Sequence, residues 1–344
     1  MIHLGKLAGA IPVLLMSLCG AAAGQSVPLD RLPEEVLPVR APAERIGGSP
    51  GTMQILDRSC PVLPAAGLRS RIVNTAVQEW GYFGFTVLDY TVAETGTRRS
   101  SSRRRWSLLD PEDALRLAGS IAGYWAAAPD SGWILQRQNN RWKASGLTSR
   151  WRDPWSAAFI SWVMCESGLG EENRFARAVA HHTYIDQAIL ARDNGSEAAY
   201  VAFDTGREPV LPGDMLCRGS RPAYRSLAER RDHLGVGART HCDIVVKVDV
   251  AGERFHVIGG NVRGTVGMKL LPAAVNDAGF LIPEPYGRRY LFAHLRLDAP
   301  PVPLDALDRS PTMVALDCIR PAGGLPGIVY QSVSSESGGT ANTC

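Results

Sequence analysis

The spacing of the apolar residues changes once along this chain, close to Gly206. Before that point, apolar residues recur at helical intervals, as in the run from Leu68 to Trp80, which is typical of an amphipathic helix. After it, short apolar runs are separated by Gly and Pro in the manner of β-strands. Helices followed by antiparallel strands predict an α+β domain.

Two of the expected helices have the same start signal. Asp110 and Asp153 are each followed by a proline, so each supplies an N-cap before a residue that suits the first helical position. The helix that begins near Asp153 is expected to end at Gly168 or Gly170. The expected helices cover residues 68–80, 110–129, 153–168 and 176–191, and the expected strands cover residues 214–217, 242–248, 254–258, 266–271 and 290–295.

Residues 1–25 have the pattern of an export signal that is removed from the mature protein. Lys6 supplies a positive charge, residues 10–18 form an apolar stretch, and the small residues up to Ala23 suit a cleavage site. The apolar stretch is too short to cross a bilayer comfortably. We therefore expect a periplasmic or secreted protein with no stable transmembrane anchor after signal removal. An uncleaved N-terminal anchor or a core helix is the alternative.

Export changes how the cysteines are interpreted. Of the seven cysteines, six remain after Cys19 is removed with the signal, and an even number in an oxidising compartment permits up to three disulfides. The spacing does not select a pairing, but Cys217 and Cys242 both lie on short predicted strands, so we favour that pair. None of the six lies in a CxxC motif, so neither a zinc site nor a redox motif is expected. We expect no metal and no cofactor.

The composition argues against a nucleic-acid-binding protein and divides the chain into a linker, a main domain and a tail. A formal net charge of +3, without a zinc-finger or phosphate-loop motif, argues against a nucleic-acid partner. Residues 26–65 are rich in proline and predict an extended linker, and residues 66–298 contain the main domain. Residues 299–344 are rich in Pro, Ser and Gly and predict a mostly poorly ordered tail. The basic run at 97–105 is expected to be a solvated loop, with contact to anionic lipid or wall polymer as the alternative.

Three residues supply the parts that acyl transfer needs, namely a nucleophile, a base and a group that orients the base. Ser156 falls at about the third helical position, where free N–H groups and the positive helix end favour negative charge. His241 opens an apolar strand, and Asn261 follows two glycines at a strand end. Each also has a structural interpretation: a helix-start serine, a structural histidine and a Gly-Gly-Asn turn.

Taken together and in order, the motifs resemble a bacterial family known as domain of unknown function 2272, over residues 71–296. This family is in turn similar to the NlpC/P60 and CHAP hydrolases, which have a papain-like fold with N-terminal helices packed on a small antiparallel sheet. Those enzymes carry a cysteine at a helix start, Gly-Asp before a strand, and a strand-initial histidine followed by a polar third residue. The matching motifs are PWSAAFISWVM at 154–164, HxxYI at 181–185, PGD at 212–214, HCDIVV at 241–246 and IGGNV at 258–262.

The resemblance implies a role for each matching residue. Ser156 takes the place of the cysteine nucleophile, His241 that of the base, and Asn261 that of the orienting residue, with Asp243 as the second choice. Asp214 matches the Gly-Asp motif and is expected to brace the sheet. A serine hydroxyl is much less acidic than a thiol and depends on concerted proton removal. A working serine hydrolase, a module that binds its ligand without cleaving it, and a site that uses other residues therefore all remain open.

Aromatic residues and a histidine near Ser156 predict a groove for sugar or peptide, with core packing as the alternative. These residues are Trp151, Trp155, His181 and Tyr184. The leading hypothesis is an exported hydrolase that cleaves an amide bond in peptidoglycan through Ser156, His241 and Asn261. The alternative is an inactive papain-like module that binds muropeptide or an envelope protein partner. A third possibility, an acyltransferase or lipid-handling enzyme, is motivated only by the basic run.

Overall fold

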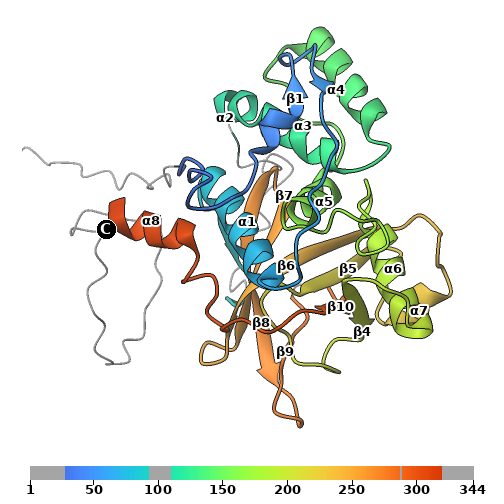
Figure 1. The fold of residues 1–344 in the computed structure, drawn as a ribbon. Coiled ribbons are helices and arrows are strands. Elements are labelled where there is room, and N and C mark those ends of the chain that lie inside the picture. Colours follow the sequence, from blue (N-terminus) through green and yellow to red (C-terminus); the bar gives the residue numbers. More distant parts are fainter. Residues whose placement is uncertain (1–27, 93–108, 110, 287–288, 320–344) are drawn as a thin grey trace, which may run out of the picture.

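The computed structural model describes residues 28–92, 109, 111–286 and 289–319 (Figure 1). The expected export signal, the basic run and Asp110 lie outside these residues. Within them the chain is a mixed α+β protein with one large sheet and one small antiparallel sheet, which confirms the predicted α+β class.

Three of the helices overlap regions where the sequence predicted helix, and the predicted 110–129 helix is divided in two, α2 and α3. The unpredicted α4 has a mostly polar sequence and buries few of its side chains, among them Ile134, Leu135 and Trp142. The helical elements are the short η1 (Pro42–Arg45), α1 (Leu68–Tyr82), α2 (Pro111–Arg116), α3 (Ala118–Ala127), α4 (Gly132–Ser145), α5 (Ser156–Glu166), α6 (His181–Asn194), α7 (Leu227–Arg231) and α8 (Pro311–Ile319).

The large sheet has eight strands in the order β3-β8-β7-β6-β5-β10-β4, with β9 also paired to β8. Neighbours are antiparallel except β3 and β8. All five predicted strands overlap β5, β6, β7, β8 and β10, whereas the short β3, β4 and β9 were not predicted. The strands are β1 (Ile46–Gly47) and β2 (Gln54–Ile55) in the small sheet, and β3 (Val87–Asp89), β4 (Tyr200–Phe203), β5 (Met215–Arg221), β6 (Arg239–Asp249), β7 (Arg254–Val262), β8 (Thr265–Val275), β9 (Leu281–Pro283) and β10 (Leu291–Leu297) in the large one.

Helix α5 occupies the centre of the core, between α3 and strands β6 and β7 (Figure 1). All of its residues are buried, as expected for a helix that is apolar on every side. Gly260 permits the close approach of α5 to β7, because a Cβ at this position would lie 2.4 Å from the Cβ of Phe159. The start of α5 is therefore held against the strands that carry His241 and Asn261.

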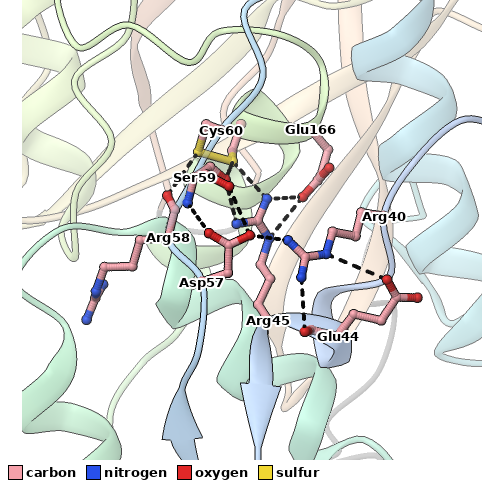
Figure 2. Close-up of polar contacts among 9 residues, drawn as sticks. Arg40, Glu44, Arg45, Asp57, Arg58, Ser59, Cys60 and Glu166 are labelled. Carbon is pink, nitrogen blue, oxygen red and sulfur yellow. Dashed lines mark hydrogen bonds and ion pairs between the residues drawn. A yellow bond between two sulfur atoms is a disulfide. The ribbon is translucent and has the colours of Figure 1, made fainter.

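Residues 28–65, which we call the N-terminal strap, differ from the predicted linker because they pack on the helices. Arg31 of the strap forms an ion pair with the buried Glu79 of α1. Arg45 donates to Glu166 at the end of α5 and, over 2.7 Å, to the carbonyl of Ser59 (Figure 2). The strap has only short regular elements, but its charged side chains have buried partners that composition alone did not reveal.

Two disulfides of the described chain join residues that are 105 and 25 positions apart in the sequence. Cys60 of the strap is bonded to Cys165 in the last turn of α5 (Figure 2). Cys217 on β5 is bonded to Cys242, which lies directly opposite on β6, and this confirms the predicted pairing.

The segment 299–319 is ordered and packed, in contrast to the predicted tail. The Leu307 N–H donates to the Val246 carbonyl of β6, and the Leu307 side chain is fully buried. Met313 and Leu316 of α8 are buried too, and α8 packs beside α1 (Figure 1). A few well-placed apolar residues thus outweigh the Pro-rich composition. Residues beyond 319 lie outside the described part of the chain.

Candidate functional site

Ser156 is the first residue of α5, and Trp155 occupies the cap position. This differs from the expected third position because Asp153, the predicted cap, forms an ion pair with Arg137 of α4 instead. The first backbone bond of the helix runs from the Phe159 N–H to the Trp155 carbonyl. The preceding N–H groups therefore have no partner within the helix, and its positive end lies beside the serine.

The Ser156 hydroxyl forms a short contact with a histidine of another helix. Its Oγ lies 2.6 Å from Nε2 of His181, the first residue of α6, and both side chains are buried. On the other side of the ring, Nδ1 accepts a 3.2 Å hydrogen bond from the backbone N–H of Cys242 and also contacts the Tyr184 hydroxyl. His181 and Tyr184 were predicted near the serine, but the pair of His181 with Ser156 was not.

These contacts determine which ring nitrogen of His181 carries the proton. A backbone N–H can only donate, so Nδ1 carries no proton and the neutral ring is protonated at Nε2. Burial lowers the pKa of His181 well below its usual value, and the nearby His241 adds to this. Nε2–H therefore donates to Ser156 Oγ, and the serine proton points away from His181. In this tautomer His181 does not act as a base toward Ser156.

His241, the predicted base, belongs to a second cluster. Its Nε2 lies 3.0 Å from Asp243 Oδ1 and 3.0 Å from Lys269 Nζ. Lys269 Nζ also lies 2.8 Å from each Asp243 oxygen. Within the described residues, Ser156 has no hydrogen bond to His241, although the His181 and His241 ring centroids are only 5.1 Å apart.

The alternation of side chains along β6 explains this separation. Cys242 and Ile244 belong to the apolar cluster under the helices, whereas Val245 belongs to the cluster on the opposite face. His241 and Asp243 share the face of Val245, so they point away from α5. Glycine at 259 makes room for them, because a Cβ there would lie 2.0 Å from Asp243 Oδ1.

The second cluster holds a balanced pair of charges beside a neutral histidine. Burial lowers the pKa of His241 to about 4, although Asp243 opposes the shift. Burial also raises the pKa of Asp243, but His241 and Lys269 more than offset this and hold that pKa far below its usual range. At neutral pH, Asp243 is thus ionised and paired with Lys269, and His241 is uncharged.

Asn261 lies at the end of β7 in the left-handed region, with φ of 55°, which asparagine tolerates better than most residues. It was predicted to orient His241, but the carboxylate that accepts a hydrogen bond from that ring is Asp243, the second choice. Asn261 instead lines the cavity that contains Ser156 and His241.

This cavity has a volume of about 310 Å³ and is bordered by β5, β6, β7, β8 and the start of α5. Its other polar lining residues are Arg218, Ser220, Thr240, Arg263, Lys269, Tyr286 and Arg289. Trp151 and Trp155 line a neighbouring cavity of about 200 Å³, with Asn261 on the wall of both. Trp155 is only 2% exposed and Tyr184 only 1%, so most of their surface packs in the core.

Sequence reasoning missed Arg218, Lys269 and Tyr286. Lys269 had a usable signal, because a lone charge inside the apolar run 266–271 has to be buried with a partner. Arg218 and Tyr286 carry no such signal, since their positions depend on how the strands pair.

Some site types are not found in the described part of the chain. It contains no group of three metal-binding side chains. Nor does it contain a helix with both the length and the apolar character needed to cross a membrane.

The fold and site define a mixed α+β protein with a buried serine–histidine pair at a helix start and a basic cavity beside it. Residues 112–291, more than half of the chain, match the family model described as an uncharacterized protein conserved in bacteria, domain of unknown function 2272. The chain belongs to this family. No curated protein and no solved structure matches it.

Proposed function

We propose that this protein is a cell-envelope module with a papain-like cleft, which binds a peptidoglycan fragment without cleaving it. One observation carries the proposal: the Cys242 N–H donates to His181 Nδ1. As a result, His181 donates to Ser156 rather than accepting its proton, so the serine lacks the adjacent base that activates a hydroxyl nucleophile.

The position of α5 supports a papain-like relationship. NlpC/P60 and CHAP hydrolases carry the nucleophile at a helix start and a histidine near the start of a strand. Here Ser156 begins α5, and α5 packs on the antiparallel strands β6 and β7, with His241 near the start of β6. Asp214 accepts from Arg69 of α1 and contacts His294 of β10, which suits the bracing role of a Gly-Asp motif.

The two disulfides support an envelope location. Disulfides persist in oxidising compartments such as the periplasm and are rare in the cytosol. Cys60–Cys165 and Cys217–Cys242 both join segments that lie side by side in the fold. They agree with the export pattern in the sequence and with a ligand of the cell wall.

Co-sedimentation with purified peptidoglycan sacculi tests the proposal, combined with analysis of the soluble muropeptides. We expect the mature protein to pellet with sacculi and release no new product. Ser156→Ala should also release no product and should still pellet, with binding weakened by about a few-fold at most because one donor on the cavity wall is lost. Release of product by the wild type that Ser156→Ala abolishes would contradict a binding-only role, and failure of the wild type to pellet would remove the proposed ligand.

An amide-bond hydrolase is the second candidate, and one observation favours it. The Ser156 proton points away from His181, and His241, which is hydrogen-bonded to Asp243, lies on the wall of the same cavity. In this case His241 would take the Ser156 proton and the free N–H groups of α5 would stabilise the oxyanion. Hydrolysis should then be lost in Ser156→Ala and His241→Ala and kept in His233→Ala, which changes an exposed histidine.

A further inference from the structure

The cavity beside Ser156 is lined by hydrogen-bond donors and positive charges. Arg218, Arg263, Lys269 and Arg289 all contribute to its wall, and no aspartate or glutamate is among the described residues that line it. Lys269 is balanced by Asp243 beneath the wall. The three arginines are left as excess positive charge around one small space.

Three buried polar atoms on this wall have no partner among the described residues. They are Arg218 Nε, Thr240 Oγ1 and the Tyr286 hydroxyl. Buried polar groups are normally hydrogen-bonded, so each such atom requires an explanation. All three carry a proton, because arginine stays charged and burial raises the pKa of Tyr286 above its usual value. A ligand that accepts hydrogen bonds would satisfy them together.

Arg218 is the charged group among these three donors. It lies directly opposite His241 across the β5–β6 pair, so both side chains are on the cavity face of the sheet. Its positive charge also contributes to the lowered pKa of His241 and of Lys269. No ion pair of the described chain involves Arg218, unlike Arg45, Arg69 and Arg230, which are buried and paired.

We propose that this cavity binds the terminal carboxylate of a peptide, with the Arg218 guanidinium as its ion-pair partner and Thr240 and Tyr286 as further donors. A planar guanidinium matches a carboxylate with two parallel hydrogen bonds. The Ser156 proton, which points away from His181, adds a donor at the helix end of the cavity. The cavity volume of about 310 Å³ suits the end of a peptide rather than a folded partner.

The choice of a carboxylate rests on the proposed function, because peptidoglycan stem peptides carry carboxylates and no phosphate. Calorimetric titration with N-acetyl-alanyl-alanine, as the free acid and as its C-terminal amide, tests it on the mature wild-type protein. We expect the acid to bind at least about tenfold more tightly than the amide, since a charge-assisted hydrogen bond pair is lost in the amide. Inorganic phosphate is titrated in parallel.

Arg218→Gln should abolish the preference for the acid, and Arg218→Lys should keep only part of it, because lysine lacks the planar fork. Thr240→Val and Tyr286→Phe should each weaken acid binding by a few-fold, about the effect of one lost donor. Arg309→Gln is the matched control, since Arg309 is exposed and does not line the cavity. Circular dichroism checks that each variant is folded.

Equal binding of acid and amide by the wild type, or a preference that survives Arg218→Gln, would overturn the proposal. Tighter binding of phosphate than of the acid would reassign the site to a phosphate ligand and would also overturn it. The sacculus assay separates the two proposals. Retention on sacculi without an Arg218-dependent acid preference would refute this inference alone, and the reverse result would refute the proposed function alone.

Discussion

The two ends of α5 carry buried polar groups of opposite character. At the C-terminal end, Glu166 is paired with Arg45, whose guanidinium also donates to the strap, and the Cys60–Cys165 disulfide lies beside them (Figure 2). At the N-terminal end, Ser156 faces a cavity in which the Arg218 Nε has no partner among the described residues. We call the C-terminal end the closed end, because its charges are paired with each other, and the N-terminal end the open end, because it borders the cavity.

This difference between the two ends distinguishes charged groups that stabilise the fold from charged groups that we propose bind a ligand. A carboxylate at a helix C-terminus opposes the helix dipole, and burial raises the pKa of Glu166. Arg45 offsets part of both effects and at the same time holds the strap to the end of α5. Arg218 forms no ion pair in the described chain, so its partly buried guanidinium stabilises no contact of that kind. Four experiments test this contrast.

The largest effect is expected from the disulfide at the closed end. Cys60→Ser with Cys165→Ser opens a loop with a sequence separation of 105, which should lower the free energy of unfolding by about 5 kcal/mol. Cys217→Ser with Cys242→Ser opens a loop with a separation of only 25, with an expected loss of about 3.5 kcal/mol. Urea unfolding measures both, and a larger loss in the Cys217→Ser, Cys242→Ser variant would reverse the contrast.

Arg45→Met should destabilise the protein by about 4 kcal/mol, because it leaves the carboxylate of Glu166 buried without its partner. The matched control is Arg40→Met, which breaks the more exposed Arg40–Asp57 pair and should change stability by less than about 1 kcal/mol. Urea unfolding of the two variants compares them directly. Similar losses of stability in the two variants would mean that burial does not increase the contribution of the Arg45–Glu166 pair.

The open end should respond to acid through His241. Its pKa is about 4 in the fold and 6.5 otherwise, so the unfolded chain binds the proton first and stability falls as the pH drops from 6.5 to 4. The contribution is about 3 kcal/mol in total. His241→Gln should therefore flatten the pH dependence of urea unfolding by that amount, and an unchanged slope would show that His241 is already protonated near pH 6.

The smallest effect has the opposite sign. Arg218→Met should raise the free energy of unfolding by about 1 kcal/mol, because it removes an unpaired buried donor. The same substitution at Arg45 is strongly destabilising, so the pair of variants measures the contrast with one type of side-chain change. A loss of stability in Arg218→Met would indicate that Arg218 has a structural role.

The sequence predicted the parts of the molecule whose signals are local. The apolar run after Pro154 predicted α5, and short apolar runs predicted β6 and β7. The predicted residues Ser156, His241 and Asn261 lie around one cavity because α5 packs on those two strands. Their roles as catalytic residues stay predictions.

The remaining features depend on packing that no local pattern encodes. Whether His241 or His181 meets Ser156 depends on the face of β6 to which His241 belongs and on where α6, which begins with His181, is placed. The strap was misjudged for a related reason, since Arg45 resembles a solvated charge until its partner Glu166 is known. Composition describes a segment alone, whereas burial depends on its neighbours.

The Cys217–Cys242 bond has a further consequence for the assembly of the cavity. Arg218 and His241 are the chain neighbours of these cysteines, and they too face each other across β5 and β6. A shift of one residue between the strands would send Arg218 to the opposite face and separate the two sulfurs. The two cysteines can therefore form a disulfide only when β5 and β6 pair in the correct register. Once formed, the bond holds the register that places Arg218 and His241 together on the cavity wall.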